Sequence, residues 1–593
     1  MQSAQTYLEV VSRRGERRLE LRRVYRQLQN QEWYLLAYAK LYSNVGALTP
    51  GVDSKDTVDA MSLKRIDDII WAVKKGSYHW KPVRRQYISK KNGKLRPLGL
   101  PSWSDKLLQE VLRMILSAYY EPQFSESSHG FRPGHGCHTA LRDIYAGWKG
   151  TKWFIEGDIK GCFDNISHSK LLEIISRSIR DERLIKLLKG MVDAGHLEEW
   201  RQHQTYSGVP QGGVLSPLLT NVFLNELDMY VEKSLIPPYT RGERRRVNPE
   251  YACIQQAKRK AKKNGDVRQY RLLQKELQRR PSKVTDDPEY RRLRYCRYAD
   301  DFLLGFVGTR QEAEEVKQKI GKFLQTLDLS LSEEKTLITH AIEESAQFLG
   351  YEIRMAMSNT RMCKHIRSIN GHTLLKVPDK VAKEWKTRYT HKGKPCHRTE
   401  LLEQSDHDIV TTYGMEFQGL VNYYALAYDV SRKLYPVKWA YEQSLVKTLA
   451  YKHKRPATWA YRQYKRKMEN GISAIVVETP REGKKPLLTK FGATPICQDK
   501  WAVIPDRKTR LWPSRNELVK RLLAEKCELC GSTENIQVHH ARKLKDIEQR
   551  YKGRPDPPYW AIRQMEIRRK TLVVCGKCHQ EIHAGTYDSQ KLE

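Results

Sequence analysis

The residues of this sequence best suited to chemistry are two adjacent aspartates, Asp300 and Asp301, which lie between two runs of β-forming residues in the segment 294–306. The pattern predicts a β-hairpin with the two acids at its turn. Two neighbouring ionised carboxylates repel each other and resist burial, so a site that keeps them needs a cation, and hard oxygen ligands suit Mg²⁺. The best candidate for a third carboxylate is Asp158, which ends an apolar, strand-like run just before a glycine-containing break.

One aspartate on one strand and a pair on a hairpin can hold two metal ions between them. Such a site aligns an attacking hydroxyl, a phosphorus atom and a leaving oxygen for in-line displacement, which is the reaction of nucleotidyl transfer. The alternative is a solvated Asp-Asp turn, and the presence of Asp158 upstream favours the metal site over it. We therefore expect Asp158, Asp300 and Asp301 to be catalytic residues and ligands of Mg²⁺, with Mn²⁺ as an alternative ion.

A second group of metal-binding residues lies near the C-terminus. Two C-x-x-C pairs supply four thiolates, which match a tetrahedral structural zinc site; they are Cys527, Cys530, Cys575 and Cys578. The segment is short, so Zn²⁺ binding is expected to contribute much of its folding energy. Histidines in the same segment, beyond those that the zinc needs, indicate a second, catalytic metal. They are adjacent in the chain, His539 and His540, or four residues apart on a predicted helix, His579 and His583.

The length and the charge of the chain limit the kinds of protein that could position these residues. At 593 residues the chain has room for about four domains. Lysine and arginine exceed aspartate and glutamate by 106 to 69, a formal net charge of +37 spread along the chain, which indicates a large polyanionic partner. No run of about 18 apolar residues is present, so a spanning membrane protein is excluded. The first five residues lack an apolar signal core, from which we expect a reducing cytoplasm.

Six sequence blocks, in a fixed order, resemble those of reverse transcriptases, and among them the proteins encoded by bacterial group II introns. The resemblance runs along nearly the whole chain, and the order of the blocks makes it specific. The blocks are residues 94–101, 129–134, 153–164, 208–217, 298–301 and 348–351.

This resemblance implies a multidomain α+β protein. Its fold would be that of a right-hand polymerase, with fingers, a palm built on an antiparallel sheet with packed helices, and an α-helical thumb, followed by a small zinc-containing ββα-metal module of the HNH type. The implied domains are an N-terminal extension with fingers (1–145), a palm (146–375), a thumb or maturase domain X (376–470), a basic DNA-binding link (471–520) and an HNH endonuclease (521–593).

The resemblance also implies a nucleotide-binding set around the aspartates. Arg96, and less strongly Lys94, would contact the phosphates of the incoming nucleotide, although both could be ordinary exposed cations of a hairpin. Phe163 would act as a steric gate against a 2′-hydroxyl, or else belong to the core. Gln211, in a glycine turn that permits close approach, would reach the nascent base pair. Lys335 would lie near the triphosphate, and a surface salt bridge is an equally good interpretation.

In the C-terminal segment the arrangement resembles HNH nucleases. That resemblance implies that His540 is the base that activates water, and that His539, His579 and His583 are ligands of the nuclease metal, which would be Mg²⁺. The sequence departs from the HNH pattern at Lys570, where the family usually has an asparagine that orients the base. A structural zinc module that binds DNA without cutting it is the alternative.

A basic insertion separates two of the blocks. Residues 241–294 contain 18 lysines and arginines against 7 aspartates and glutamates, a net charge of +11. Such density usually indicates a solvated or disordered arm, yet the segments 258–263 and 270–275 have helical propensity. We expect this insertion to contact RNA.

The resemblance thus implies a multifunctional intron-encoded protein. It would be an RNA-directed DNA polymerase that binds its intron RNA as a ribonucleoprotein to promote splicing, and that nicks double-stranded target DNA to prime copying with dNTPs. It would be cytoplasmic and associated with the bacterial nucleoid. The alternatives are a host-defence or diversity-generating reverse transcriptase, which would lack residues 376–593, and a non-mobile splicing cofactor with a decayed polymerase, against which the intact aspartates argue.

Overall fold

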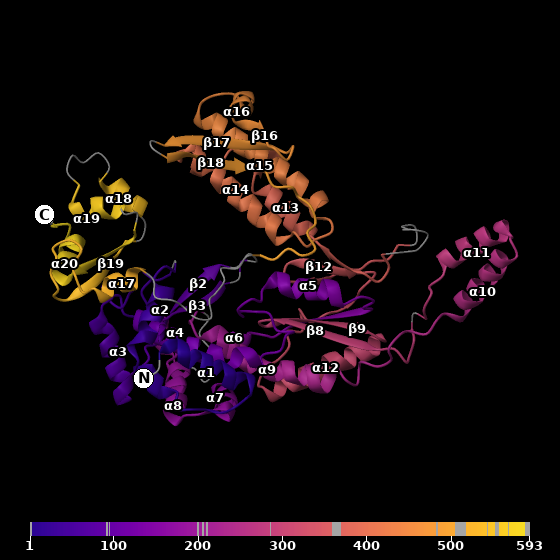
Figure 1. Cartoon of the computed structure of the whole chain (residues 1–593), viewed down its shortest axis with the longest axis horizontal. Coiled ribbons are helices and arrows are strands. Elements are labelled where there is room, and N and C mark those ends of the chain that lie inside the picture. The colour runs from indigo at the N-terminus through magenta and orange to yellow at the C-terminus, as the bar shows by residue number, and fades with distance from the viewer. Residues whose placement is uncertain are drawn as a thin grey trace.

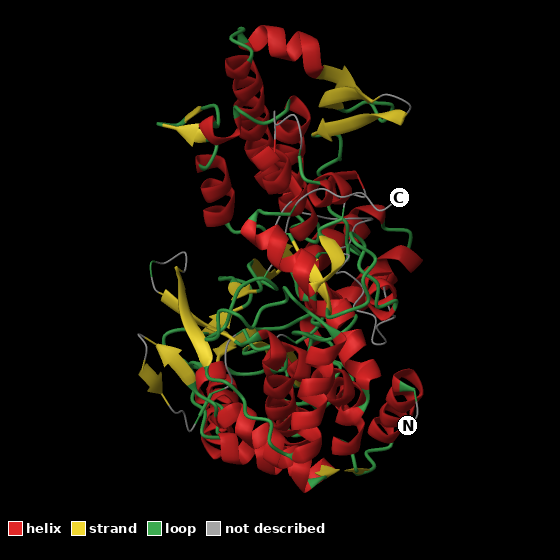
Figure 2. Cartoon of the chain, turned by 90° about the vertical axis from the view of Figure 1, so that its left-hand side faces the viewer, coloured by secondary structure: helices red, strands yellow, loops and turns green. Residues whose placement is uncertain are grey.

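The computed structural model describes residues 3–44, 46–89, 93, 95–198, 201–203, 207–208, 212–284, 286–358, 369–481, 484–504, 517–541, 544–551, 557–566 and 569–587. Figure 1 shows a broad lower body built from the N-terminal helices and a central sheet, with a helical unit above it. A pair of helices projects from one end of the body, and the C-terminal module lies against the N-terminal helices at the other end. Figure 2 shows from the side that helices dominate both the lower body and the unit above. No helix among the described residues is long and apolar enough to cross a membrane.

Four helices form the N-terminal layer, and a Ser or Asn side chain caps the start of each by accepting a hydrogen bond from a backbone N–H of the first turn. Helices α2 and α4 are buried around most of their circumference, as expected of helices whose apolar residues are not confined to one stripe. The layer consists of α1 (Ala4–Glu16), α2 (Gln31–Leu41), α3 (Leu63–Lys75) and α4 (Trp103–Tyr120).

Beside this layer lies a four-stranded sheet of order β3-β2-β6-β7. Its strands are β2 (Val83–Ser89), β3 (Leu95–Leu100), β6 (His196–Glu198) and β7 (Arg201–His203). The antiparallel β2–β3 hairpin is mostly exposed along its far end, so its side chains are available to a ligand.

The central sheet has the order β10-β4-β9-β8 and is antiparallel throughout. Its strands are β4 (Trp153–Asp158), β8 (Arg292–Tyr298), β9 (Asp301–Val307) and β10 (Ile338–His340). Alternate residues of β9 belong to different core clusters, Phe302 and Leu304 to one and Leu303 to the other, so the strand is buried on both faces.

Helices cover both faces of the central sheet (Figure 1). Helix α5 (Cys137–Gly147) packs on one face, while α9 (Ser216–Tyr230) and α12 (Arg310–Thr326) pack on the other, where the rings of Tyr230 and Phe323 stack with centroids 4.1 Å apart. The chain between β4 and α9 forms α6 (Cys162–Asn165), α7 (His168–Ser178) and α8 (Glu182–Asp193).

The basic insertion folds as two antiparallel helices, α10 (Pro249–Lys263) and α11 (Val267–Arg279), which we call the helical arm. It projects away from the body in Figure 1. Its buried residues are only Ala261 and Leu277, so the arm presents almost all of its charge to solvent. The helices predicted for segments 258–263 and 270–275 are confirmed. The alternative prediction, that the arm is disordered, is wrong for residues 249–263 and 267–279.

The upper unit starts from a three-stranded sheet, β11 (Ala346–Phe348), β12 (Tyr351–Met355) and β13 (Thr373–Lys376), and continues as α13 (Asp379–Thr387), α14 (Asp406–Tyr423), α15 (Val430–Lys452) and α16 (Ala457–Tyr464). A second sheet, β16 (Lys465–Lys467), β17 (Ser473–Arg481) and β18 (Lys484–Phe491), follows. Phe491 packs against Phe417 and Tyr441 of the helices. The boundary expected at residue 471 therefore falls inside this sheet, and the residues that follow share the core of the helices.

The C-terminal module, residues 517–587, contains α17 (Glu517–Leu523), β19 (Ile536–His540), α18 (Leu544–Tyr551), α19 (Tyr559–Glu566), β20 (Thr571–Cys575) and α20 (Gly576–Ala584). Strands β19 and β20 pair antiparallel, and α20 follows directly, which gives a ββα unit. The module shares one continuous core with the N-terminal layer, and α17 packs against α2.

Candidate active sites

The three candidate catalytic aspartates meet at one edge of the central sheet. Strands β4 and β9 pair with Asp158 opposite Asp301, and Asp300 lies in the two-residue turn that joins β8 to β9. The turn begins at Ala299, whose φ of 56° is in the left-handed region. The structure therefore brings together the carboxylates that the sequence predicted, from two adjacent strands and a turn.

The carboxylates perturb one another in the way a cation site requires. Burial, then the neighbouring Asp300 and Asp158, raises the pKa of Asp301 to about 7, and burial together with Asp158 also raises the pKa of Asp300. Lys335 donates a hydrogen bond to Asp158 Oδ2 at 2.8 Å, and this contact raises the pKa of the lysine. Three hard carboxylate ligands, two of which have raised pKa values, fit divalent cations such as Mg²⁺.

A buried ion pair that the sequence interpretation missed holds the aspartate turn in place. Arg297 of β8 and Asp228 of α9 are both completely buried and form two hydrogen bonds, Nε to Oδ1 at 2.7 Å and Nη2 to Oδ2 at 2.6 Å. The guanidinium also donates to the carbonyl of Ala299 at 2.8 Å, directly before Asp300. An arginine inside a strand buried on both faces was the available signal, because such a charge requires a buried partner.

The block around His129 lies directly behind the same turn. The backbone N–H of His129 donates to the carbonyl of Arg297 at 2.9 Å. A Cβ added to Gly130 would lie 2.4 Å from the backbone nitrogen of Ala299, so only glycine fits there.

The candidate nucleotide-binding residues are placed as follows. Arg96 is exposed on β3 and its charge lowers the pKa of Asp300, a smaller effect than burial, which places the guanidinium on the carboxylate side. Phe163 is half-buried on α6, edge-on to Phe131 with ring centroids 6.4 Å apart. Lys335 contacts Asp158, as above. Lys94 and Gln211 lie outside the described residues.

The glycine turn beside Gln211 has a structural reason that differs from the expected one. Gly212 has a φ of 113°, and a Cβ there would lie 2.6 Å from the carbonyl oxygen of Gly99. The close approach that this glycine permits is thus to strand β3, within the protein itself.

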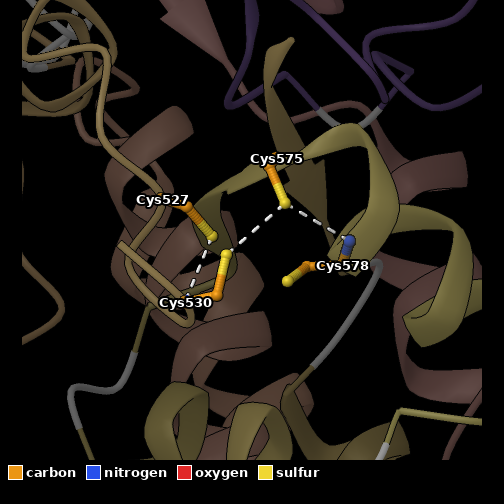
Figure 3. A group of neighbouring side chains, drawn as sticks. All are labelled: Cys527, Cys530, Cys575 and Cys578. Atoms are coloured by element: carbon orange, nitrogen blue, oxygen red, sulfur yellow. Dashed lines mark hydrogen bonds between the residues drawn. The ribbon is translucent and has the colours of Figure 1, made fainter. Parts of the chain in front are cut away.

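Four cysteines of the C-terminal module converge as predicted (Figure 3). Their Sγ atoms all lie within 4.8 Å of one another, and those of Cys530 and Cys575 are 3.6 Å apart. A tetrahedron of thiolates with metal–sulfur bonds of about 2.3 Å has edges of about 3.8 Å, so the spacing is compatible with zinc. The backbone N–H groups of Cys530 and Cys578 point at Cys527 and Cys575 respectively, which stabilises the thiolate form.

A second group of ligand atoms lies on the other side of the module and contains a residue that the sequence interpretation missed. His539, His579 and His583 gather with Asp59 so that one ligand atom of each lies within 4.8 Å of the others. Among the residues that the structure describes, this group and the four cysteines are the two that converge so closely, and the three aspartates of the central sheet are more widely spaced.

The candidate base stands apart from that group. His540 is buried, and burial lowers its pKa to about 4. Its Nε2 lies 3.0 Å from the hydroxyl of Tyr38, on α2. Lys570 is exposed, and its backbone carbonyl accepts a hydrogen bond from Ala541 at 2.8 Å, so this position contributes to the end of the β19–β20 pair through its backbone.

Comparison with protein families divides the chain in the same way as the structure. Residues 88–353 match the model of the reverse transcriptase (RNA-dependent DNA polymerase) family, residues 374–485 match the type II intron maturase family, and residues 527–579 match the AI2M/AI1M-like HNH endonuclease family. The chain is an enzyme that joins an RNA-directed DNA polymerase to an HNH endonuclease.

Full-length relatives sharpen that assignment. The chain is 37% identical over 607 residues to the group II intron-encoded protein LtrA of Lactococcus lactis subsp. cremoris, covering 98% of this chain and 99% of that protein. It is 33% identical to an uncharacterized 91 kDa protein in the cob intron of Schizosaccharomyces pombe, over 94% of this chain and 69% of that protein. The chain belongs to the group II intron-encoded proteins, multifunctional proteins of intron splicing and mobility. The resemblance drawn from the six blocks is confirmed.

Proposed function

We propose that the chain copies RNA into DNA at the edge of the central sheet, with Asp158, Asp300 and Asp301 as the catalytic ligands of Mg²⁺. The observation that carries this proposal is the register that sets Asp158 opposite Asp301, with Asp300 in the adjoining turn. When bound, the cations would neutralise charge that develops on the transferred phosphoryl group and the leaving group. The raised pKa values of the aspartates support it, because a cation relieves their mutual repulsion.

In this proposal the central sheet and its helices form the palm, the N-terminal layer with the β2–β3 hairpin forms the fingers, and the upper helices form the thumb. Arg96, on β3, and Lys335, which contacts Asp158, would bind the triphosphate. Lys94 would be a further contact. Phe163 would exclude a 2′-hydroxyl, and Gln211 would lie along the nascent base pair.

The test is primer extension by the Asp300→Asn variant on an RNA template. Replacing one carboxylate by an amide removes a charged metal ligand, so extension should fall by about two orders of magnitude or more. Asp328→Asn is the matched control, because Asp328 is an exposed aspartate whose partner is Lys170, away from the site. Extension by Asp300→Asn at the control rate would contradict the metal assignment, provided that both variants bind intron RNA equally.

We also propose that the helical arm and the thumb bind intron RNA. The arm presents its cations to solvent, and on α15 two aromatic side chains four residues apart, Tyr435 and Trp439, are more than half exposed. Cations neutralise phosphates and exposed rings stack on unpaired bases, which together suit a folded RNA with single-stranded loops. The sequence interpretation had placed most aromatics of this region in the core, and these two are exceptions.

The C-terminal module is proposed to nick double-stranded target DNA, with Zn²⁺ held by the four cysteines and the nuclease metal by His539, His579 and His583. His540 would take the proton from the attacking water. The exposed 3′-hydroxyl would then prime cDNA synthesis at the polymerase site, and binding to chromosomal targets would associate the protein with the nucleoid.

The experiment for this part compares His540→Ala with wild type in strand-specific nicking of a labelled duplex by the ribonucleoprotein. Loss of the base should lower nicking by about two to four orders of magnitude while zinc content and primer extension stay unchanged. If the variant nicks at the wild-type rate, His540 is not the base; if wild type itself does not nick, the module binds DNA without cutting it.

A further inference from the structure

The C-terminal module is docked on the N-terminal layer through a short segment, residues 57–62, which we call the docking segment. Met61 and Val538 form an antiparallel bridge: the N–H of Ala60 donates to the carbonyl of Val538 at 3.1 Å, and the N–H of Val538 donates to the carbonyl of Met61 at 2.9 Å. The docking segment thus adds a third, short strand to the edge of the β19–β20 pair. This pairing sets Asp59, two residues before Met61, against the histidines of the module.

The carboxylate of Asp59 lies at the centre of the histidine group. Its Oδ2 lies 2.8 Å from Nε2 of His583, and its Oδ1 lies 3.3 Å from Nε2 of His579. Oδ1 also accepts a hydrogen bond from the backbone N–H of His540 at 2.8 Å and lies 3.9 Å from Nδ1 of His539.

His579 is oriented with a ring lone pair directed into the group. His579 Nδ1 lies 2.9 Å from Oε1 of Gln537, which can only accept, so Nδ1 carries the proton and Nε2 offers a lone pair to the group. The Nε2 atoms of His579 and His583 are 3.3 Å apart. His539 is 94% buried, and its Nδ1 has no hydrogen-bond partner within the described residues. A buried nitrogen left without a partner, facing a carboxylate and the lone pair of His579, fits a cation.

The candidate base is closed off by the same docking. Tyr38 lies 3.0 Å from Nε2 of His540, the nitrogen that would take a proton from water, and the rings of Tyr38 and Tyr42 both lie with centroids 6.2 Å from the His540 ring. The imidazole is 8% exposed. A water molecule that attacks a phosphate would need the position that the tyrosine hydroxyl occupies.

We propose that Asp59 of the N-terminal layer is the fourth protein ligand of the nuclease metal, and that the docked module is a closed nuclease that must leave the docking segment before it can cut. The proposal rests on the nuclease function proposed above. Catalytic metal sites with three protein ligands keep a fourth position for water or substrate, and Asp59 fills that position. A DNA phosphate oxygen has the same charge and donor type as the carboxylate, so it would replace Asp59 when the module opens.

The backbone of the docking segment is consistent with a reversible clamp. Ala60, between Asp59 and Met61, has a φ of 57°, a left-handed conformation that is strained for a non-glycine residue. Release of the segment would relieve that strain, which partly offsets the breaking of the bridge hydrogen bonds.

The first experiment measures metal binding directly, with full-length protein whose four-cysteine site is already filled with zinc. Co²⁺ is titrated as a spectroscopic probe into wild type, Asp59→Asn and the control Asp53→Asn, in which a nearby aspartate paired with Lys81 is changed. The amide keeps an oxygen for the His540 N–H but is a poor metal ligand. Asp59→Asn should weaken Co²⁺ binding about tenfold or more and alter its visible spectrum, and Asp53→Asn should do neither. Wild-type affinity and spectrum in Asp59→Asn would overturn the ligand assignment.

The second experiment tests whether docking closes the nuclease. It measures the rate at which RNA-free protein nicks supercoiled plasmid at saturating Mn²⁺. Asp59→Asn should nick about tenfold faster than wild type, since it opens the fourth position, and the double variant Asp59→Asn/His540→Ala should not nick. Tyr38→Phe, which frees Nε2 of His540 and leaves the ligands intact, should also nick faster while binding Co²⁺ as wild type does. Nicking by Asp59→Asn at or below the wild-type rate would overturn closure.

Failure of the underlying nuclease function gives a different result. In that case neither wild type nor Asp59→Asn nicks, even as a ribonucleoprotein on its target duplex, and closure is overturned with it. The Co²⁺ titration still decides whether Asp59 binds the metal. Unchanged zinc content and unchanged protease resistance of residues 517–587 in every variant establish that the module stays folded.

Discussion

The buried pair of Arg297 and Asp228 allows stability and catalysis to be separated by mutation. Asp228→Ala would leave the guanidinium of Arg297, which has no exposed surface, without its counter-charge, and would remove the acceptor of the Tyr295 hydroxyl, now 2.8 Å away. Breaking a buried pair in this way costs about 3–5 kcal/mol. For a polymerase domain of this size the destabilisation corresponds to a drop of about 10 °C in the unfolding temperature.

A matched control lies on the same helix. Glu226 of α9 forms an exposed ion pair with Arg177, and an exposed pair of this kind contributes at most about 1 kcal/mol. Glu226→Ala should therefore shift the unfolding temperature by no more than about 4 °C. The comparison isolates the effect of burial, because both variants truncate an acidic side chain of α9.

The double variant Asp228→Leu/Arg297→Met then tests what the pair is for. Apolar replacements of similar volume recover most of the stability, because neither charge remains to be desolvated. They cannot restore the hydrogen bond from Arg297 to the carbonyl of Ala299, so the turn that carries Asp300 loses its support. We expect near wild-type unfolding with primer extension reduced about tenfold or more. A double variant that unfolds normally and also extends primers at the wild-type rate would refute the positioning role.

Four further predictions follow from other parts of the structure. Burial raises the pKa of Asp105 to about 6, above its value in the unfolded chain, so its contribution to stability is present at low pH and lost as pH rises through about 6. The free energy of unfolding of Asp105→Asn, relative to that of wild type, should therefore rise by about 3 kcal/mol between about pH 4 and pH 8, as measured by thermal unfolding. Gly130→Ala should displace Ala299 and lower primer extension, because the added Cβ would meet its backbone nitrogen, while RNA affinity is unchanged. Cys530→Ser should release zinc, measured by metal analysis, and make residues 517–587 susceptible to protease, with primer extension retained. Removing the helical arm, residues 249–279, should flatten the plot of log RNA affinity against log salt by about 0.7 for each phosphate that the arm neutralises, and an unchanged slope would mean that the arm does not bind RNA.

Local patterns predicted those parts of the sites that lie close together in the sequence. The alternation of apolar residues around Asp300 and Asp301 specified a hairpin, and the spacing of the cysteines and of His579 and His583 specified a zinc knuckle and one face of a helix. In these cases the chemistry and the element that carries it are encoded in the same few residues. The roles of Lys94 and Gln211 remain predictions, since both lie outside the described residues.

Long-range partners were not predictable in the same way. Arg297 signalled by its place in an apolar strand that it needed a buried acid, but nothing local identified Asp228, 69 positions earlier, among the acids of the chain. The β17–β18 hairpin was expected to belong to a basic link, because residues 471–520 contain clusters of lysine and arginine and several prolines. The role of its apolar residues becomes clear only when the helices that they cover are known.

The nuclease site shows most clearly the difference between local patterns and long-range contacts. The sequence identified the side chains that could bind a metal, but not the residues of another domain that cover them. Within the module, the four-residue spacing places His579 and His583 on one face of α20, and the fold of the module brings His539 to them. Two contacts that we propose to close the site come from the N-terminal layer: the hydroxyl of Tyr38 contacts His540 across 502 positions, and Asp59 contacts the backbone of His540 across 481. Contacts between domains depend on the complementarity of two folded surfaces, which no periodicity encodes. The same holds at Lys570, whose backbone carbonyl accepts a hydrogen bond from Ala541 just before β20 begins, while the side chain that contacts His540 is a tyrosine of the N-terminal layer.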